Sequence, residues 1–158
     1  ENRLITEVNG KWYNWSGADG YQDFDWSDQW IVGVGVQYAA IPEKLFLRAG
    51  YNYGNNPVDR NNGWGAGTQN VQGNVFPDYY YETFRVIGFP AVVEHHASIG
   101  IGYAFSETFE LNAAYVHAFA KDITERGTLQ APGAPAIPAE INSELSEDSL
   151  ELGLTWRF

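Results

Sequence analysis

Apolar and polar residues alternate strictly along the last nine positions of the chain. One face of an extended strand would carry Leu150, Leu152, Leu154, Trp156 and Phe158, and the other would carry Glu151, Gly153, Thr155 and Arg157. This period of two predicts a β-strand with one apolar face. A closing strand with a terminal aromatic residue, Phe158, at the membrane interface is typical of a transmembrane β-barrel. The last strand of a soluble sandwich would show the same alternation, so this segment alone leaves both architectures open.

Five earlier segments show the same alternation. They are Leu4–Tyr13, Trp30–Tyr38, Leu45–Tyr53, Ala97–Phe105 and Phe109–Phe119. Each has the roughly 9–11 residues that a tilted strand needs to cross a bilayer, whereas strands of soluble proteins more often have about 5–6. Several begin and end on aromatic residues, as expected for the girdles of a barrel. Helical periodicity is weak throughout, so we predict an all-β antiparallel fold.

The connections between these strands alternate between long and short. Residues 14–29, 54–96 and 120–149 form long connections, while 39–44 and 106–108 form short ones. An up-and-down barrel has this pattern, with short periplasmic turns and long extracellular loops. A Greek-key sandwich gives no reason for it. We therefore predict an antiparallel up-and-down transmembrane β-barrel.

Six strands are too few for a known bacterial membrane barrel, which has at least about eight. An open sheet edge in lipid would leave backbone groups unpaired. Either other copies complete the barrel or the chain belongs to a longer one. The sequence contains no Met and so does not begin at a natural start. We expect residues 1–158 to be the C-terminal portion of a single outer-membrane barrel domain.

Composition narrows the classes of function. The 158 residues include no Cys, and no apolar run approaches the roughly 20 residues of a transmembrane helix. The formal net charge of −11 argues against nucleic acid as a partner, because phosphate binding needs a basic surface. It also disfavours a peripheral protein held by anionic lipids.

The order of motifs resembles the C-terminal part of the FadL-like long-chain fatty-acid transporters, an outer-membrane family that also takes up aromatic hydrocarbons. The matching segments are 11–16, 28–38, 44–54 and 89–105, followed by the closing strand to Phe158, and the most specific are Leu47–Tyr51 and His95–Tyr103. The resemblance implies a monomeric barrel of about fourteen strands, an even number, whose lumen is plugged by an N-terminal hatch. Family members capture hydrophobic substrate with outer loops and release it sideways into the bilayer. The hatch and the main capture loops lie N-terminal to the matching part.

We therefore expect passive uptake of long-chain fatty acids or aromatic hydrocarbons across the bacterial outer membrane. This role needs no cofactor and no catalytic residue, and it involves hydrophobic small molecules, membrane lipid and lipopolysaccharide as partners. One alternative is a structural or adhesive barrel whose long outer loops bind a partner. An outer-membrane enzyme is a third reading, which would need a Ser/His or Asp/His constellation.

The long connection 54–96 carries the candidate substrate contacts. Its aromatic residues are Trp64, Phe76, Tyr79, Tyr80, Tyr81, Phe84 and Phe89. So much aromatic area on a loop indicates either a packed lid or the lining of an opening for hydrophobic ligands, and the two are compatible. Arg85 is a candidate anchor for a carboxylate.

Other clusters give weaker signals. Glu94-His95-His96 resembles a metal motif, but adjacent residues on a strand face opposite sides, and the third histidine, His117, lies on another strand. The aspartates of the first loop are Asp19, Asp23, Asp25 and Asp28. Calcium favours such carboxylates, but the spacing fits no EF-hand and acidic outer loops are ordinary surface, so we predict no metal site.

The inward register carries mixed charges and glycines. The charged positions are Glu7, Lys11, Arg48, Glu110, Glu151 and Arg157. Such a lumen suits contact with a hatch better than a path for hydrophobic substrate. The Pro-rich stretch 131–138 cannot form ladder hydrogen bonds and is expected to be an outer loop.

Overall fold

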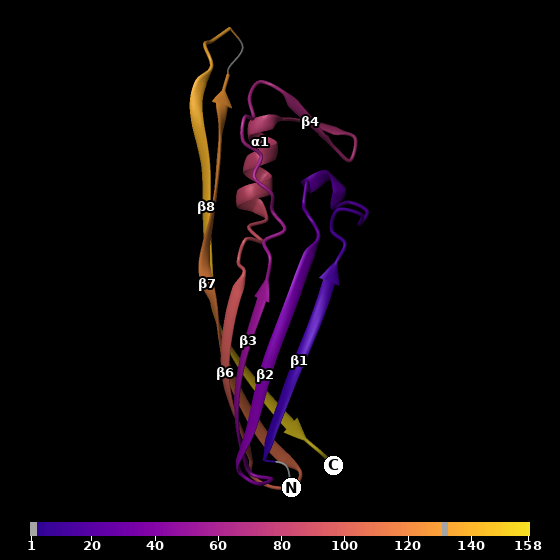
Figure 1. Ribbon diagram of the computed structural model, residues 1–158, viewed down its shortest axis with the longest axis vertical. Coiled ribbons are helices and arrows are strands. Elements are labelled where there is room, and N and C mark those ends of the chain that lie inside the picture. Colours follow the sequence, from indigo (N-terminus) through magenta and orange to yellow (C-terminus); the bar gives the residue numbers. More distant parts are fainter. Residues whose placement is uncertain (1–2, 131–132) are drawn as a thin grey trace.

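The computed structural model describes residues 3–130 and 133–158. Six strands form one antiparallel sheet in which each strand pairs with the next, in the order β1-β2-β3-β6-β7-β8 (Figure 1). They are β1 (Leu4–Tyr13), β2 (Gln29–Ile41), β3 (Leu45–Gly54), β6 (His95–Ala104), β7 (Phe109–Leu129) and β8 (Ile137–Trp156). The predicted all-β antiparallel fold is confirmed, and each predicted strand has its counterpart.

The connection between β3 and β6 is folded rather than irregular. It contains a small hairpin of β4 (Thr68–Val71) and β5 (Asn74–Pro77), followed by α1 (Asp78–Thr83) and a π-helical turn, η2 (Phe84–Gly88). A short 3₁₀ turn, η1 (Gln22–Phe24), lies in the first long connection. Helix α1 begins directly after Pro77 with Asp78 in its first turn, where an acidic side chain is favoured by the helix dipole.

The prediction that residues 120–149 form a loop is wrong. Strand β7 continues to Leu129 and β8 begins at Ile137, so the two strands extend well beyond the rest of the sheet (Figure 1). The Pro-rich stretch contributes Ile137 and Pro138 to the start of β8, while its residues 131–132 lie outside the described part. The long strands form because one side of them is buried, as described below.

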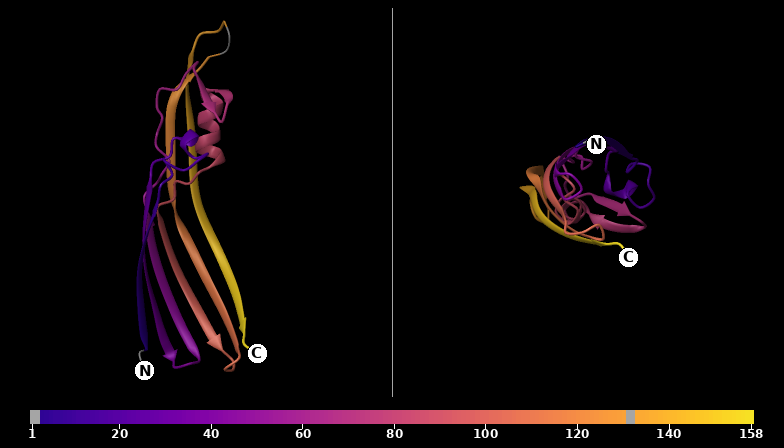
Figure 2. Two further views of the ribbon diagram at one scale, coloured as in Figure 1. Left: turned by 90° about the vertical axis from the view of Figure 1, so that its right-hand side faces the viewer. Right: turned by 90° about the horizontal axis from the view of Figure 1, so that it is seen from below.

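The sheet curves, and its two faces differ in character. Viewed from below, the strands follow an arc, and the long connections lie over its concave side (Figure 2). The convex face carries the apolar half of the alternation, and its side chains are open to the surroundings: Val8, Ile99, Leu150, Leu152 and Leu154 are between 64% and 74% exposed. Hydrophobic side chains follow one another across neighbouring strands, as in the row Leu4, Tyr38, Leu47, Ile101, Ala113 and Leu152. The convex face is therefore one continuous apolar surface.

Aromatic residues gather at both ends of this convex face. Near the tight turns, the rings of Tyr103, Phe105, Phe109 and Trp156 contact one another in sequence. At the other end, Trp12 lies beside Trp30, and Tyr51 and Tyr53 contact His95. Two aromatic rows thus border the apolar surface.

A β-bulge divides the β7–β8 ribbon into two parts of opposite polarity. The pairing passes from Ala118–Glu147 to Lys121–Leu145, so β7 carries one extra residue, and such an insertion reverses which side its residues face. Beyond the bulge, in what we call the distal hairpin (residues 121–129 and 137–147), Ile123 and Ile141 are buried on the concave side. The convex side there carries Asp122, Arg126 and Glu140. The apolar side of the ribbon therefore changes at the bulge.

The buried core of the described residues lies above the sheet, not on it. We call this unit the cap; it consists of residues 14–28, 55–94 and the distal hairpin. Its core is formed by Trp26, Val58, Trp64, Val86, Val92, Ile123 and Ile141. Among the described helices, none has the length and apolar character needed to span a membrane.

Candidate functional site

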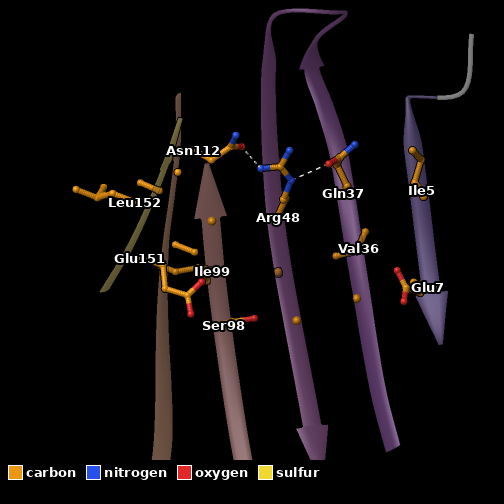
Figure 3. A pocket seen from close by; sticks show the side chains of 17 residues that line it. Ile5, Glu7, Val36, Gln37, Arg48, Ser98, Ile99, Asn112, Glu151 and Leu152 are labelled. Atoms are coloured by element: carbon orange, nitrogen blue, oxygen red, sulfur yellow. Dashed lines mark hydrogen bonds between the residues drawn. The ribbon is translucent and has the colours of Figure 1, made fainter. Parts of the chain in front are cut away.

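The lower part of the concave face is a hollow of about 700 Å³, lined by residues of all six strands (Figure 3). Its polar side chains are those of Glu7, Gln37, Arg48, Ser98, Asn112 and Glu151. Arg48 on β3 organises it. Its Nε donates to Gln37 Oε1 at 2.7 Å and its Nη1 donates to Asn112 Oδ1 at 2.5 Å. Glu110 Oε1 lies 3.8 Å from Arg48 Nη2. The hollow is thus crossed by a hydrogen-bonded row from β2 to β7.

Glycine keeps this face open where the arginine crosses it. A Cβ atom at Gly102 would lie 2.6 Å from Asn112 Oδ1 and 2.9 Å from Arg48 Nη1, too close for either atom to stay. The charged residues predicted on this register are present on it: Glu7 and Glu151 border the hollow, and Lys11 lines a neighbouring one. Arg157 instead lies at the end of β8, where its Nη1 donates to the Glu107 carbonyl at 3.4 Å.

The aromatic candidates of residues 54–96 divide into buried and exposed sets. Trp64 and Tyr81 are buried in the cap, and Tyr79 packs partly against its core. These three behave as the packed lid that the sequence offered as one reading. Phe76, Tyr80, Phe84 and Phe89 remain between 41% and 63% exposed.

Phe84 and Phe89 form an exposed aromatic cluster with Phe24 of η1. Their ring centroids lie 5.0 Å apart, and those of Phe24 lie 5.8 Å from Phe84 and 5.2 Å from Phe89. Phe24 was not among the sequence candidates, because it lies some sixty positions earlier and alternation says nothing about loop contacts. Phe84 and Phe89 are 52% and 43% exposed, so this cluster is one of the apolar features of the cap that are open to a ligand.

Arg85, the sequence candidate for a carboxylate anchor, is not open to a ligand. It is fully buried and bonded within the protein. Its Nε donates to Glu82 Oε2 at 2.9 Å, its Nη1 donates to the Asp59 carbonyl at 2.6 Å, and its Nη2 bonds Glu125 Oε1. The hypothesis of an anchoring role is therefore not supported by its position, because its donors are committed to this cluster.

Asn61 completes the surroundings of this buried cluster. Its backbone N–H donates to Glu125 Oε1 at 2.9 Å, and its side-chain Nδ2 donates to Glu82 Oε1 at 3.4 Å. Burial raises the pKa of Glu82 to about 7, against the lowering effect of Arg85. The nearby Tyr81 hydroxyl donates to the Asp23 carbonyl at 2.7 Å, and burial raises its pKa to about 12. The sequence carried one signal for this site, since Glu125 falls on the same side of β7 as Ile123.

The histidines lie apart, as their positions on the strands predict. His95 is on the convex face, where its Nδ1 lies 2.5 Å from the Tyr51 hydroxyl, and His96 faces the concave side, lining a hollow there. His117 Nδ1 lies 2.8 Å from Asp148 Oδ1 on the convex face, and among the described residues no serine or threonine hydroxyl bonds that histidine.

The aspartates of the first loop also serve local contacts. Asp23 Oδ2 accepts from the Gln72 backbone N–H at 3.2 Å, and Asp28 Oδ1 accepts from the Ser16 hydroxyl at 2.8 Å. Within residues 3–130 and 133–158, no group of three or more His, Asp or Glu side chains is arranged to hold a metal ion.

Comparison with known proteins adds no identification, since no family model, curated protein or solved structure matches this chain. The arguments about function below therefore rest on the residues and their arrangement.

Proposed function

We propose that the chain forms part of the wall of a larger outer-membrane β-barrel that takes up hydrophobic molecules. The observation that supports this most is the continuous apolar convex face, bordered by two aromatic rows, on a sheet whose opposite face carries the hydrogen-bonded row of Gln37, Arg48 and Asn112. A water-soluble protein rarely exposes so large an apolar surface. Lipid on the convex side and a polar lumen on the concave side would satisfy both faces.

The two outer strands, β1 and β8, also favour a larger barrel. Each has one neighbour in the sheet, and an unpaired edge within lipid leaves backbone groups without partners at a cost of several kcal/mol each. Further strands of the same polypeptide would close the ring, in agreement with the family resemblance, and the complete barrel would then act as a monomer.

The exposed aromatic cluster supports uptake as the activity. Phe24 belongs to η1, and Phe84 and Phe89 lie in and directly after η2. Both segments are parts of the cap, which lies at the end of the sheet away from the tight turns (Figure 2). Apolar pockets with few polar groups suit fatty acids and aromatic hydrocarbons. In this proposal the cluster contacts the hydrophobic molecule before it reaches the lumen, and transport proceeds by binding and diffusion without covalent chemistry.

The test is uptake by cells that make the complete protein with Phe84→Ser and Phe89→Ser together. We expect uptake of a radiolabelled long-chain fatty acid or an aromatic hydrocarbon to fall several-fold at an unchanged amount of folded protein. Both rings are about half exposed, so their loss should spare folding. Val75→Ser is the matched control, because Val75 is 66% exposed on β5 and has no part in the cluster.

Uptake unchanged by the double substitution would overturn this role for the cluster. If uptake of both substrate types is unaffected while attachment to a partner cell or protein is lost, the adhesive alternative is favoured. Deleting the loop residues 59–85 would be a less specific test than point substitutions. The deletion would remove the buried residues Trp64, Glu82 and Arg85 and so disrupt the folding of the cap.

A further inference from the structure

The buried cluster of Glu82, Arg85 and Glu125 joins two separate parts of the cap. Glu82 and Arg85 belong to the helical segment 78–88, whereas Glu125 comes from β7 of the distal hairpin. Arg85 bonds both carboxylates, and all three residues are at most 2% exposed. The cluster is therefore the polar connection between the helical segment and the hairpin.

The charges of this cluster do not balance when both carboxyl groups are ionised. One guanidinium then faces two carboxylates, and burial of a net charge is costly. Glu125 Oε2 is buried without a hydrogen-bond partner in the described structure. The cluster therefore lacks a hydrogen-bond donor as well as a second positive charge. A single proton on the carboxyl pair removes the excess charge, and burial raises the pKa of Glu82 towards neutrality.

Among the described residues, the other cations on the surrounding elements have different partners or surroundings: Lys121 of β7 pairs with Glu94 at 2.6 Å, Arg126 pairs with Glu140, and Arg60 is exposed. Asp59 contributes only its carbonyl oxygen to Arg85. Strand β8 presents Ile141 and Leu145 to this core. Asp23 and Asp25 of the first loop lie towards Tyr81, and Asp78 is bonded to Gly65 N–H and Gln69 at the start of α1. These aspartates would add negative charge.

We propose that the Glu82–Arg85–Glu125 cluster is a pH-sensitive latch, which holds the helical segment on the distal hairpin while one carboxyl group is protonated and loosens when that proton leaves. The device belongs to the cap and is independent of what the protein transports.

The direction of the pH dependence follows from the sign of the shift. The pKa of Glu82 is higher in the closed cap, about 7, than its ordinary value of 4.5. The closed state therefore binds a proton that the open state releases, and its stability is full below about pH 4.5 and declines as the pH rises to about 7. Linkage allows at most about a tenfold increase in opening per pH unit over this interval.

The experiment is hydrogen–deuterium exchange of the segment 78–88 in the purified complete protein, from pH 5 to pH 8. Each pH is compared with the variant Glu82→Gln, which mimics the protonated side chain, so that the intrinsic pH dependence of exchange cancels. We expect the ratio of opening in the unaltered protein to opening in the variant to rise several-fold between pH 5 and pH 7 and then level off. A ratio constant within twofold over the whole range would overturn the latch.

A second variant keeps the proposal testable if Glu82→Gln does not accumulate. Glu125→Gln also removes one carboxylate from the pair and should show the same loss of pH dependence. Glu140→Gln is the matched control, because Glu140 pairs with Arg126 on the exposed side of the same hairpin. The control should open with the same pH dependence as the unaltered protein, and a loss of that dependence in the control would also overturn the latch.

Discussion

At the scale of single residues, the fit between Trp64 and Gly127 holds the β3–β6 connection to the distal hairpin. The backbone N–H of Thr128 donates to the Trp64 carbonyl at 2.8 Å, and the indole ring lies directly over Gly127. A Cβ atom at position 127 would collide with the ring and with the Trp64 carbonyl oxygen. Gly127 is thus required for space rather than for an unusual backbone conformation.

Gly127→Ala should therefore destabilise the cap. The ring must move out of the core, and overpacking of this kind costs about 1–3 kcal/mol. Urea unfolding followed by tryptophan fluorescence measures the change. Gly10→Ala is the control, because a Cβ atom there has as its nearest neighbour the Ile31 carbonyl oxygen at 3.9 Å. Equal stability of the two variants would contradict the packing argument.

Residue-level expectations from the sequence succeeded where a residue's face on a strand decides its surroundings. Arg48 and Glu151 line the concave hollow as alternation predicted, and His95 and His96 face opposite sides. They failed for Arg85, because alternation carries no information about a helical segment within a long connection. A charged residue among aromatic residues of a loop indicates a ligand anchor when only the sequence is considered. In the structure, Arg85 bonds Glu82 and Glu125 instead.

At the scale of elements, the length of the β7–β8 ribbon is the feature that the sequence pattern did not predict. The apolar positions of β8 change from odd, at Ile137, Ile141 and Leu145, to even from Leu150 onward. Read as one strand, this stretch loses its period of two, so alternation does not reveal it as a strand. The change of phase is itself a signal, since a strand that passes from the apolar convex face to the cap core must move its apolar residues to the other side.

The distal hairpin should depend on its buried side for stability. Ile123 is 1% exposed against Trp64 and Val86 in the cap core. Ile123→Ala should cost about 2–4 kcal/mol, because truncation of a buried isoleucine leaves a cavity. Asp122→Ala, at the exposed neighbouring position, should change stability by less than about 0.5 kcal/mol.

The rate of hydrogen exchange of the hairpin amides measures the stability of the hairpin in both variants. The two substitutions remove side chains from adjacent residues of one strand, so an equal effect would show that the hairpin does not rest on the cap core.

At the scale of the whole molecule, the decisive property is that the apolar surface and the buried core are in different places. The core lies in the cap, while the sheet exposes the apolar residues of all six strands on its convex side. The sequence predicted the order and direction of the strands, because alternation and short turns are local. It offered a packed lid for residues 54–96 as one reading, but it did not predict that this lid shares a core with Trp26 of the first loop and with Ile123 and Ile141 of the distal hairpin.

Leu152→Arg distinguishes lipid from water as the surroundings of the convex face. Leu152 is 74% exposed on the convex side of the outer strand β8, between Leu150 and Leu154, so in water the substitution should be almost without effect. In a bilayer, a charge near the midplane of a barrel costs about 2–4 kcal/mol. We therefore expect the free energy of unfolding, measured in phospholipid vesicles, to be lower by this amount in the variant. Glu144→Arg, on the polar convex side of the distal hairpin, is the control and should show no such loss. A near-zero effect of Leu152→Arg in vesicles would contradict a membrane-spanning sheet.

The separation of sheet and cap has a consequence for the order in which the molecule assembles. Four of the five strand pairings in the sheet join segments separated by short or moderate lengths of chain, and only β3–β6 encloses the 40 residues 55–94. The cap core requires Trp26, Trp64 and Ile123 to meet, and contacts between distant parts of a chain form slowly because loop closure must precede them. Strand pairing can therefore run ahead of cap closure. Between strand pairing and cap closure, residues 55–94 would be an open segment on an ordered sheet. A protease acting at that stage would be expected to cleave the chain within this connection.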